Sequence, residues 1–149
     1  MMAHRRGVIL AVLATAIFGG CGRARPEVQA ATGREIYVAR CALCHGLNRE
    51  GAPGLYPPLA GSEWVGGPPG RLAAVILDGM RGPVGNYNAV MPGWRGVLRD
   101  SEIAAVMTWL RQSEGKSPVT AVEVGHVALE TAGRNTFWTA PDLQNLRLR

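Results

Sequence analysis

A run of five residues combines two thiols with an imidazole: Cys41-Ala42-Leu43-Cys44-His45. Two cysteines separated by two residues and followed at once by a histidine have the spacing used for covalent haem attachment. Each thiol can form a thioether with one of the two vinyl groups of a porphyrin, and the imidazole that follows can bind the iron. The run therefore predicts one haem c, bound covalently through Cys41 and Cys44, with His45 as a ligand of its iron.

Three other uses of these thiols agree less well with the rest of the chain. A redox dithiol of the thioredoxin type lies in a βαβ context, which the sequence does not show. A structural zinc site needs four ligands, and outside the N-terminal segment only His126 could complete the set. A disulfide between Cys41 and Cys44 would close a small, strained ring. We expect His126 to lie on the surface and to bind no metal.

Residues 1–20 have the features of an export signal. A basic start covers residues 4–6, and residues 8–18 form an apolar run that is too short to span a bilayer as a helix. We predict a signal peptide over residues 1–20 and a location in the bacterial periplasm. An ordinary signal peptide cut nearby and an uncleaved anchor are the alternative interpretations.

The end of this segment suggests a lipid anchor. Residues 18–21, Phe-Gly-Gly-Cys, resemble the lipobox of bacterial lipoproteins, in which the cysteine becomes the lipidated N-terminus. Cys21 would then attach the protein to a membrane, with residues 21–31 as the lipid attachment site and tether. Gly22 rather than an aspartate follows the cysteine, and the sequence leaves both the inner and the outer membrane open.

The remaining chain is typical of an all-α, loop-rich domain. It shows no strand alternation and no internal repeat, and residues 46–70 contain five Pro and seven Gly, which predicts a long loop. A second loop is expected over residues 81–96. Capping boxes, apolar periodicity and stop residues predict helices over residues 33–44, 72–77, 100–114, 120–131 and 139–145.

The helix over residues 100–114 has the clearest pattern. Its apolar residues recur at the spacing of one helix face, at Ile103, Val106, Met107 and Leu110. Hydrophobic residues make up 47% of the 149-residue chain, enough for one domain core. Because the chain holds only two Phe and three Tyr, a large buried cofactor would supply apolar volume that the side chains lack.

Residues 32–114 resemble the class I cytochrome c family. In that family the first and last helices cross at a glycine and aromatic residues, and here Gly33 and Tyr37 match the first helix while Trp109 matches the second. The resemblance implies the class I cytochrome c fold, an all-α domain built around one covalent haem. Residues 115–149 lie outside the family pattern and are expected to form a C-terminal helical extension.

The resemblance also implies supports for the histidine. The family has a Pro-x-Leu step after the haem motif, which Pro57-Pro58-Leu59 fits. It implies that the Pro57 carbonyl accepts a hydrogen bond from His45 Nδ1–H, which orients the imidazole and raises its basicity. Leu59 would pack on the haem. The sequence does not separate Pro57 from Pro58 in this role.

Two methionines precede the helix over residues 100–114 and could supply the sixth iron ligand. Met91 stands in a Met-Pro step like the one that carries the ligand in the family, and Pro92 keeps Met91 out of the helical region. Met80 stands in a glycine-rich exit from the preceding helix. We predict Met91 as the ligand, with Met80 as the alternative, and Met107 as a core residue.

Other aromatic and basic residues have weaker signals. Trp64 and Trp94 could line the haem or donate to a propionate, and simple packing explains them equally well. Arg71, Arg81 and Arg95 are expected on the solvated surface, with pairing to propionates as the alternative.

The function predicted from these observations is single-electron transfer by a monohaem carrier with His/Met-ligated iron, not an enzyme. Its partners would be redox proteins, such as an oxidase, a dehydrogenase or another cytochrome, without a small-molecule substrate. Loss of Arg5 and Arg6 with the signal lowers the net charge from +5 to +3, and no basic cluster with aromatics is present, which excludes nucleic-acid binding. The alternatives are a cytochrome subunit of a membrane dehydrogenase or terminal oxidase and an open-site haem enzyme or gas sensor.

Overall fold

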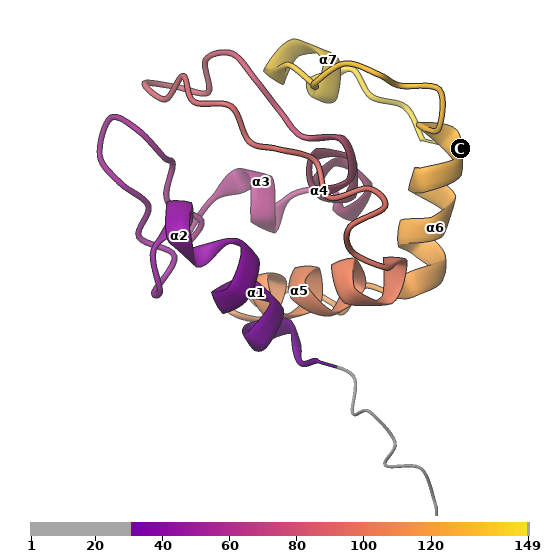
Figure 1. Ribbon diagram of the computed structural model, residues 1–149, viewed down its shortest axis with the longest axis horizontal. Coiled ribbons are helices and arrows are strands. Elements are labelled where there is room, and N and C mark those ends of the chain that lie inside the picture. The colour runs from indigo at the N-terminus through magenta and orange to yellow at the C-terminus, as the bar shows by residue number, and fades with distance from the viewer. Residues whose placement is uncertain (1–30, 149) are drawn as a thin grey trace, which may run out of the picture.

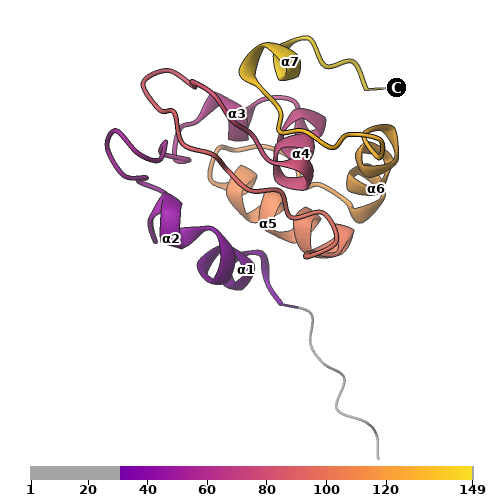
Figure 2. The ribbon, with the colours of Figure 1, turned by 45° about the horizontal axis from the view of Figure 1, so that its top comes forward.

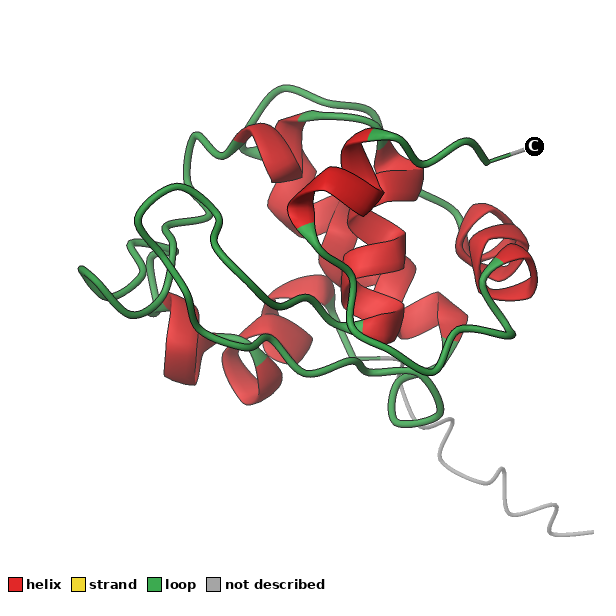
Figure 3. Ribbon diagram, turned by 90° about the horizontal axis from the view of Figure 1, so that it is seen from above, coloured by secondary structure: helices red, strands yellow, loops and turns green. Residues whose placement is uncertain are grey.

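The computed structural model describes residues 31–148, so the predicted signal peptide and Cys21 lie outside the described residues. Within that range every regular element is a helix, which confirms the all-α class (Figures 1 and 3). The helices are α1 (Gly33–Arg40), α2 (Ala42–His45), α3 (Glu63–Gly66), α4 (Pro69–Asp78), α5 (Asp100–Gln112), α6 (Ala121–Glu130) and α7 (Ala140–Gln144). No helix among residues 31–148 combines the length and the hydrophobicity needed to cross a bilayer.

Several elements differ from the sequence prediction. The first helix is interrupted at Cys41, which ends α1 and begins α2. The predicted loop over residues 46–70 contains α3, whose first turn is capped by the Ser62 hydroxyl accepting from Trp64 N–H at 3.2 Å. Helix α4 begins at Pro69, because proline at the first helical position loses no intrahelical hydrogen bond. Helix α6 covers Ala121–Glu130, within one residue of the predicted range 120–131 at each end.

Helix α1 crosses α5 at very short range (Figures 1 and 2). A Cβ atom at Gly33 would overlap the Ala105 carbonyl and lie only 2.8 Å from Trp109 Cβ, so only glycine fits there. Tyr37, one turn later, is fully buried and its ring centroid lies 4.8 Å from that of Trp109. Its hydroxyl donates to the Gly46 carbonyl at 2.6 Å, which ties α1 to the loop after α2.

Helix α4 lies at the centre of the main core. Buried residues of α4 and α5 pack together with residues of the C-terminal extension, including Val124, Trp138 and Leu143. In Figure 1, α6 lies beside α4 and α5. The predicted capping box of α6 is present, with the Thr120 side chain accepting from Glu123 N–H. The extension therefore folds onto the same core as the preceding helices.

The start of the extension is attached to α5 by a separate pair of hydrogen bonds. The Thr108 hydroxyl donates to the Val119 carbonyl at 3.1 Å and accepts from the Val119 N–H at 2.9 Å. This attachment lies in sequence directly before α6 and involves no residue of the loop that precedes α5.

We predict that Gly33→Ala lowers the free energy of unfolding by about 1–3 kcal/mol, because the added methyl overpacks the α1–α5 crossing. Denaturant unfolding followed by tryptophan fluorescence measures the change. Gly66→Ala is the matched control, since its Cβ would meet only Lys116 Cε at 3.7 Å. Equal effects of the two substitutions would contradict the close crossing.

Alkaline pH tests the buried tyrosine. Burial, with a smaller contribution from Cys41, raises the pKa of Tyr37 from 10 to about 12. The unfolded chain then ionises Tyr37 first, so its contribution to stability is complete below pH 10 and is lost as pH rises toward 12.

We therefore expect the stability difference between wild type and Tyr37→Phe to shrink across this pH range. Denaturant titrations of both proteins at a series of pH values measure it, and the lysine and arginine titrations common to both cancel. A difference independent of pH would contradict burial of the hydroxyl.

Candidate functional site

The break between α1 and α2 presents the two thiols to one pocket. The Cys41 carbonyl accepts from both Cys44 N–H, at 3.1 Å, and His45 N–H, at 2.9 Å, which forms one tight turn. Both cysteines are free thiols and both line the pocket. Leu43, between them, is 95% exposed. The turn thus directs both cysteines and the histidine inward and leaves its middle at the surface.

His45 is held by its Nδ1 atom. Only 8% of the residue is exposed, and Nδ1–H donates to the Pro57 carbonyl oxygen at 3.0 Å. Burial lowers the pKa of His45, and the bond to Pro57 opposes this shift in part. A neutral imidazole with Nδ1 occupied leaves Nε2 as the free nitrogen for a metal.

A glycine shapes the loop that carries this carbonyl. Gly51 has a φ of 70°, and a Cβ there would lie 2.7 Å from the carbonyl carbon of Pro57. The Gly51 N–H also donates to the His45 carbonyl at 2.8 Å. The structure thus places Pro57 rather than Pro58 in contact with His45, while Leu59 lies further along the pocket wall.

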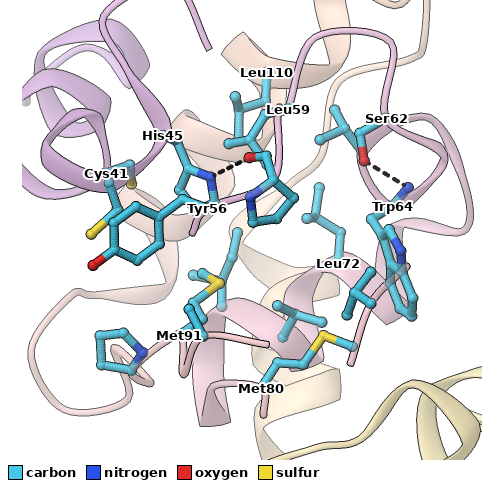
Figure 4. Close-up of a pocket in the computed structure, with 18 of the residues that line it drawn as sticks. Cys41, His45, Tyr56, Leu59, Ser62, Trp64, Leu72, Met80, Met91 and Leu110 are labelled. Carbon is cyan, nitrogen blue, oxygen red and sulfur yellow. Dashed lines mark hydrogen bonds between the residues drawn. The ribbon is translucent and has the colours of Figure 1, made fainter. Parts of the chain in front are cut away.

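The pocket is apolar and draws on distant parts of the chain (Figure 4). Burial, and secondarily the neighbouring Cys44, raises the pKa of the Cys41 thiol to about 11. A thiol that stays protonated at neutral pH is a poor redox nucleophile, which argues against a thioredoxin-type dithiol. Apart from the attachment run, the pocket is lined largely by aliphatic side chains, such as those of Leu59, Leu72, Val75, Ile76, Leu98, Val106 and Leu110.

Both candidate methionines extend into this pocket (Figure 4). They are opposed in one short antiparallel backbone pair, with Met80 N–H donating to Met91 O at 3.0 Å and Met91 N–H donating to Met80 O at 2.8 Å. Met80 is 8% exposed and belongs to the core cluster, whereas Met91 is only partly buried. Met107 is fully buried away from the pocket lining, which confirms it as a core residue.

The weaker candidates divide into three groups. Trp64 and Trp94 line the pocket, and Arg71 stacks 4.5 Å from the Trp64 ring centroid. Arg81 and His126 are exposed, as predicted. Arg95 is not a freely solvated surface side chain as expected, since it forms an ion pair with Asp78 at 2.6 Å, and its pairing with a propionate stays a prediction. Seventeen residues separate that pair, and neither residue lies in a motif that could have indicated it.

The sequence is similar to several known cytochromes. The family model described as cytochrome c oxidase, cbb3-type, subunit III matches residues 28–110. Cytochrome c-552 of Thermus thermophilus is 37% identical over 128 residues, which cover 76% of this chain and 82% of that protein. Cytochrome c55X of Paracoccus denitrificans is 32% identical over 111 residues, covering 74% of this chain and 96% of that protein.

A larger protein also contains a similar region. The cytochrome c subunit of the quinone alcohol dehydrogenase of Gluconobacter oxydans is 34% identical over 110 residues, 70% of this chain but 23% of that subunit. The helical fold, the apolar pocket with its cysteine pair and these matches agree. The chain belongs to the cytochrome c family and is a class I c-type cytochrome, a protein that binds haem c covalently and transfers single electrons.

Proposed function

We propose that Cys41 and Cys44 hold the haem, and that His45 and Met91 bind its iron from opposite sides. The observation that carries this proposal is the convergence of two free thiols, an imidazole with Nδ1 occupied and two thioethers on one apolar pocket. The haem iron supplies the redox chemistry by accepting and releasing one electron. With both axial positions filled by side chains, no substrate needs to reach the metal.

Each ligand has a support suited to its task. The hydrogen bond from His45 to Pro57 fixes the plane of the imidazole and raises its basicity toward the metal. Met91 offers a soft, neutral thioether, which favours the reduced state and raises the potential. The apolar walls keep water away from both ligands, a second influence that raises the potential.

The exposure of the two methionines favours Met91 over Met80. A side chain that binds a group in the pocket must present its sulfur at the pocket surface, and Met91 is the more exposed of the two. Met80 is packed into the core cluster formed by α4, α5 and the extension. Pro92 further restricts Met91 to an extended backbone, which suits a side chain directed away from the chain.

Electrons would enter and leave at the attachment turn, where Leu43 reaches the surface. A redox protein docked there would approach the haem edge nearest the thioethers, and no small-molecule substrate is required. The proposed function is therefore that of a carrier between two protein partners rather than an enzyme.

A second function is membership of a larger redox complex. The matches to the cytochrome c subunit of a quinone alcohol dehydrogenase and to the cbb3-type oxidase subunit CcoP of Azospirillum brasilense favour it. Copurification of a stoichiometric partner in mild detergent would support the complex. Isolation of a monomer that exchanges electrons by collision would support the free carrier.

We predict that Met91→Leu abolishes the weak long-wavelength band that a Met–iron bond gives in the oxidised protein. The reduction potential should fall on the order of 0.1 V, a modest part of the roughly 0.8 V that haem axial ligands span. Met80→Leu is the matched control, because it also replaces a thioether by an apolar group of similar volume and should keep the band.

The visible spectra of both variants, oxidised and reduced, measure this outcome. Loss of the band in Met80→Leu instead would assign the ligand to Met80. Rapid carbon monoxide binding by the reduced wild-type protein would contradict a closed site and favour an enzyme or gas sensor.

We further propose export to the bacterial periplasm through residues 1–20 and lipid attachment at Cys21. Cys21→Ser should then move the haem protein from the membrane fraction to the soluble periplasmic fraction, because a serine cannot accept the thioether-linked lipid. Fractionation followed by haem staining measures the distribution. An unchanged distribution would contradict the lipid anchor.

A further inference from the structure

The segment that carries Met91 is attached at both ends. On its N-terminal side, Met91 is paired with Met80 through two backbone hydrogen bonds. On its C-terminal side, Trp94 N–H donates to the Ile76 carbonyl and Arg95 N–H to the Leu77 carbonyl, each at 2.9 Å. Residues 91–95 therefore lie against the last turn of α4.

The Arg95 side chain connects this segment to the C-terminal extension. Its Nε donates to Asp78 Oδ1 at 2.6 Å, its Nη1 to the Ala128 carbonyl at 2.9 Å and its Nη2 to Thr131 Oγ1 at 2.6 Å. Asp78 and Thr131 are both buried, with side-chain exposure of 5% for Asp78. One guanidinium thus joins the Met91 segment, the end of α4 and the end of α6.

A second contact comes from Trp138, in the segment between α6 and α7. Trp138 N–H donates to the Gly79 carbonyl at 3.0 Å, and Arg81 N–H donates to the Trp138 carbonyl at 2.8 Å. Met80 consequently lies between Met91 on one side and Trp138 on the other. The extension therefore supports the Met91 segment through Met80, which is paired with both Met91 and Trp138.

The three segments approach one another closely at Gly79. Gly79 has a φ of 76°, and a Cβ there would lie 2.5 Å from the Met91 carbonyl oxygen, 2.7 Å from Gly93 N and 2.9 Å from Phe137 Cδ1. Release of the Met91 segment from the pocket would therefore break its contacts with Gly79 and, through the Arg95 side chain, with the extension.

We infer that the C-terminal extension is the device that keeps the Met91 thioether in the pocket, and that Arg95 is its principal positioning residue. This inference rests on the proposed role of Met91 as the iron ligand. Release of the segment would separate Arg95 from Asp78 and leave a buried carboxylate without its cation, which is strongly unfavourable. The ion pair of Arg95 with Asp78 therefore disfavours the conformation in which the Met91 segment has left the pocket.

Imidazole binding to the oxidised haem protein tests this inference, because exogenous imidazole binds only where Met91 has left the iron. We expect Arg95→Met to bind imidazole at least about tenfold more tightly than wild type, since charge-assisted hydrogen bonds of the closed form are lost. Hydrogen exchange at the Met80, Met91 and Arg95 amides should accelerate in parallel.

A second variant keeps the ion pair with Asp78. Thr131→Val removes the contact of Arg95 Nη2 with the extension, together with the hydrogen bond that Thr131 Oγ1 donates to the Val127 carbonyl within α6, and it preserves the side-chain shape. We expect Thr131→Val to bind imidazole about threefold more tightly than wild type. This effect is smaller than that of Arg95→Met, because Arg95 loses only one neutral hydrogen-bond acceptor. An effect of Thr131→Val would show that contacts of Arg95 with the extension help to hold Met91, because this variant keeps the ion pair of Arg95 with Asp78.

Thr108→Val is the matched control, since it removes hydrogen bonds between the extension and α5 but touches no residue of the ligand segment. Its imidazole affinity should equal that of wild type. Unchanged affinity in both Arg95→Met and Thr131→Val, or an equal effect of Thr108→Val, would overturn the inference. Absence of the Met–iron band from wild type would instead overturn the proposed ligand, and the inference with it.

Discussion

The contact of Gly33 with the backbone of α5 decides where the redox centre lies. Because no side chain separates the two helices there, α1 is fixed in position and direction. Cys41 follows α1 directly, so the cysteine pair and His45 are placed relative to α5 by that same contact. Tyr37 adds a buried ring against Trp109 and a hydrogen bond to the loop beyond. One short crossing thus determines the geometry of one whole wall of the pocket.

The opposite wall depends on a different kind of interaction. Helix α4 supplies apolar side chains, but the methionine segment has no regular secondary structure and is held by backbone hydrogen bonds to its neighbours. Arg95 joins these neighbours around a buried carboxylate. The histidine side is therefore fixed by helix packing, and the methionine side by a small polar network within the core.

Local sequence signals predicted the first wall and the two methionines of the second, but not the contacts that hold the methionine segment. The attachment run, the capping boxes at Thr32 and Thr120 and the apolar face of α5 each lie within a few residues, and all three appear in the structure. The ion pair of Arg95 and the pairing of Met80 with Trp138 join residues far apart, through loops without periodicity. Helix α3 was missed because its four residues stand in a glycine- and proline-rich segment.

The position of these supports along the chain also implies an order of assembly. Synthesis from the amino end produces the cysteine pair and His45 well before the residues of α6 and Trp138. During that interval the methionine segment has its backbone hydrogen bonds to Met80 and α4 but lacks the contacts that Arg95 makes with the extension. The extension, which is the last part of the domain to be made, completes the support of the methionine side.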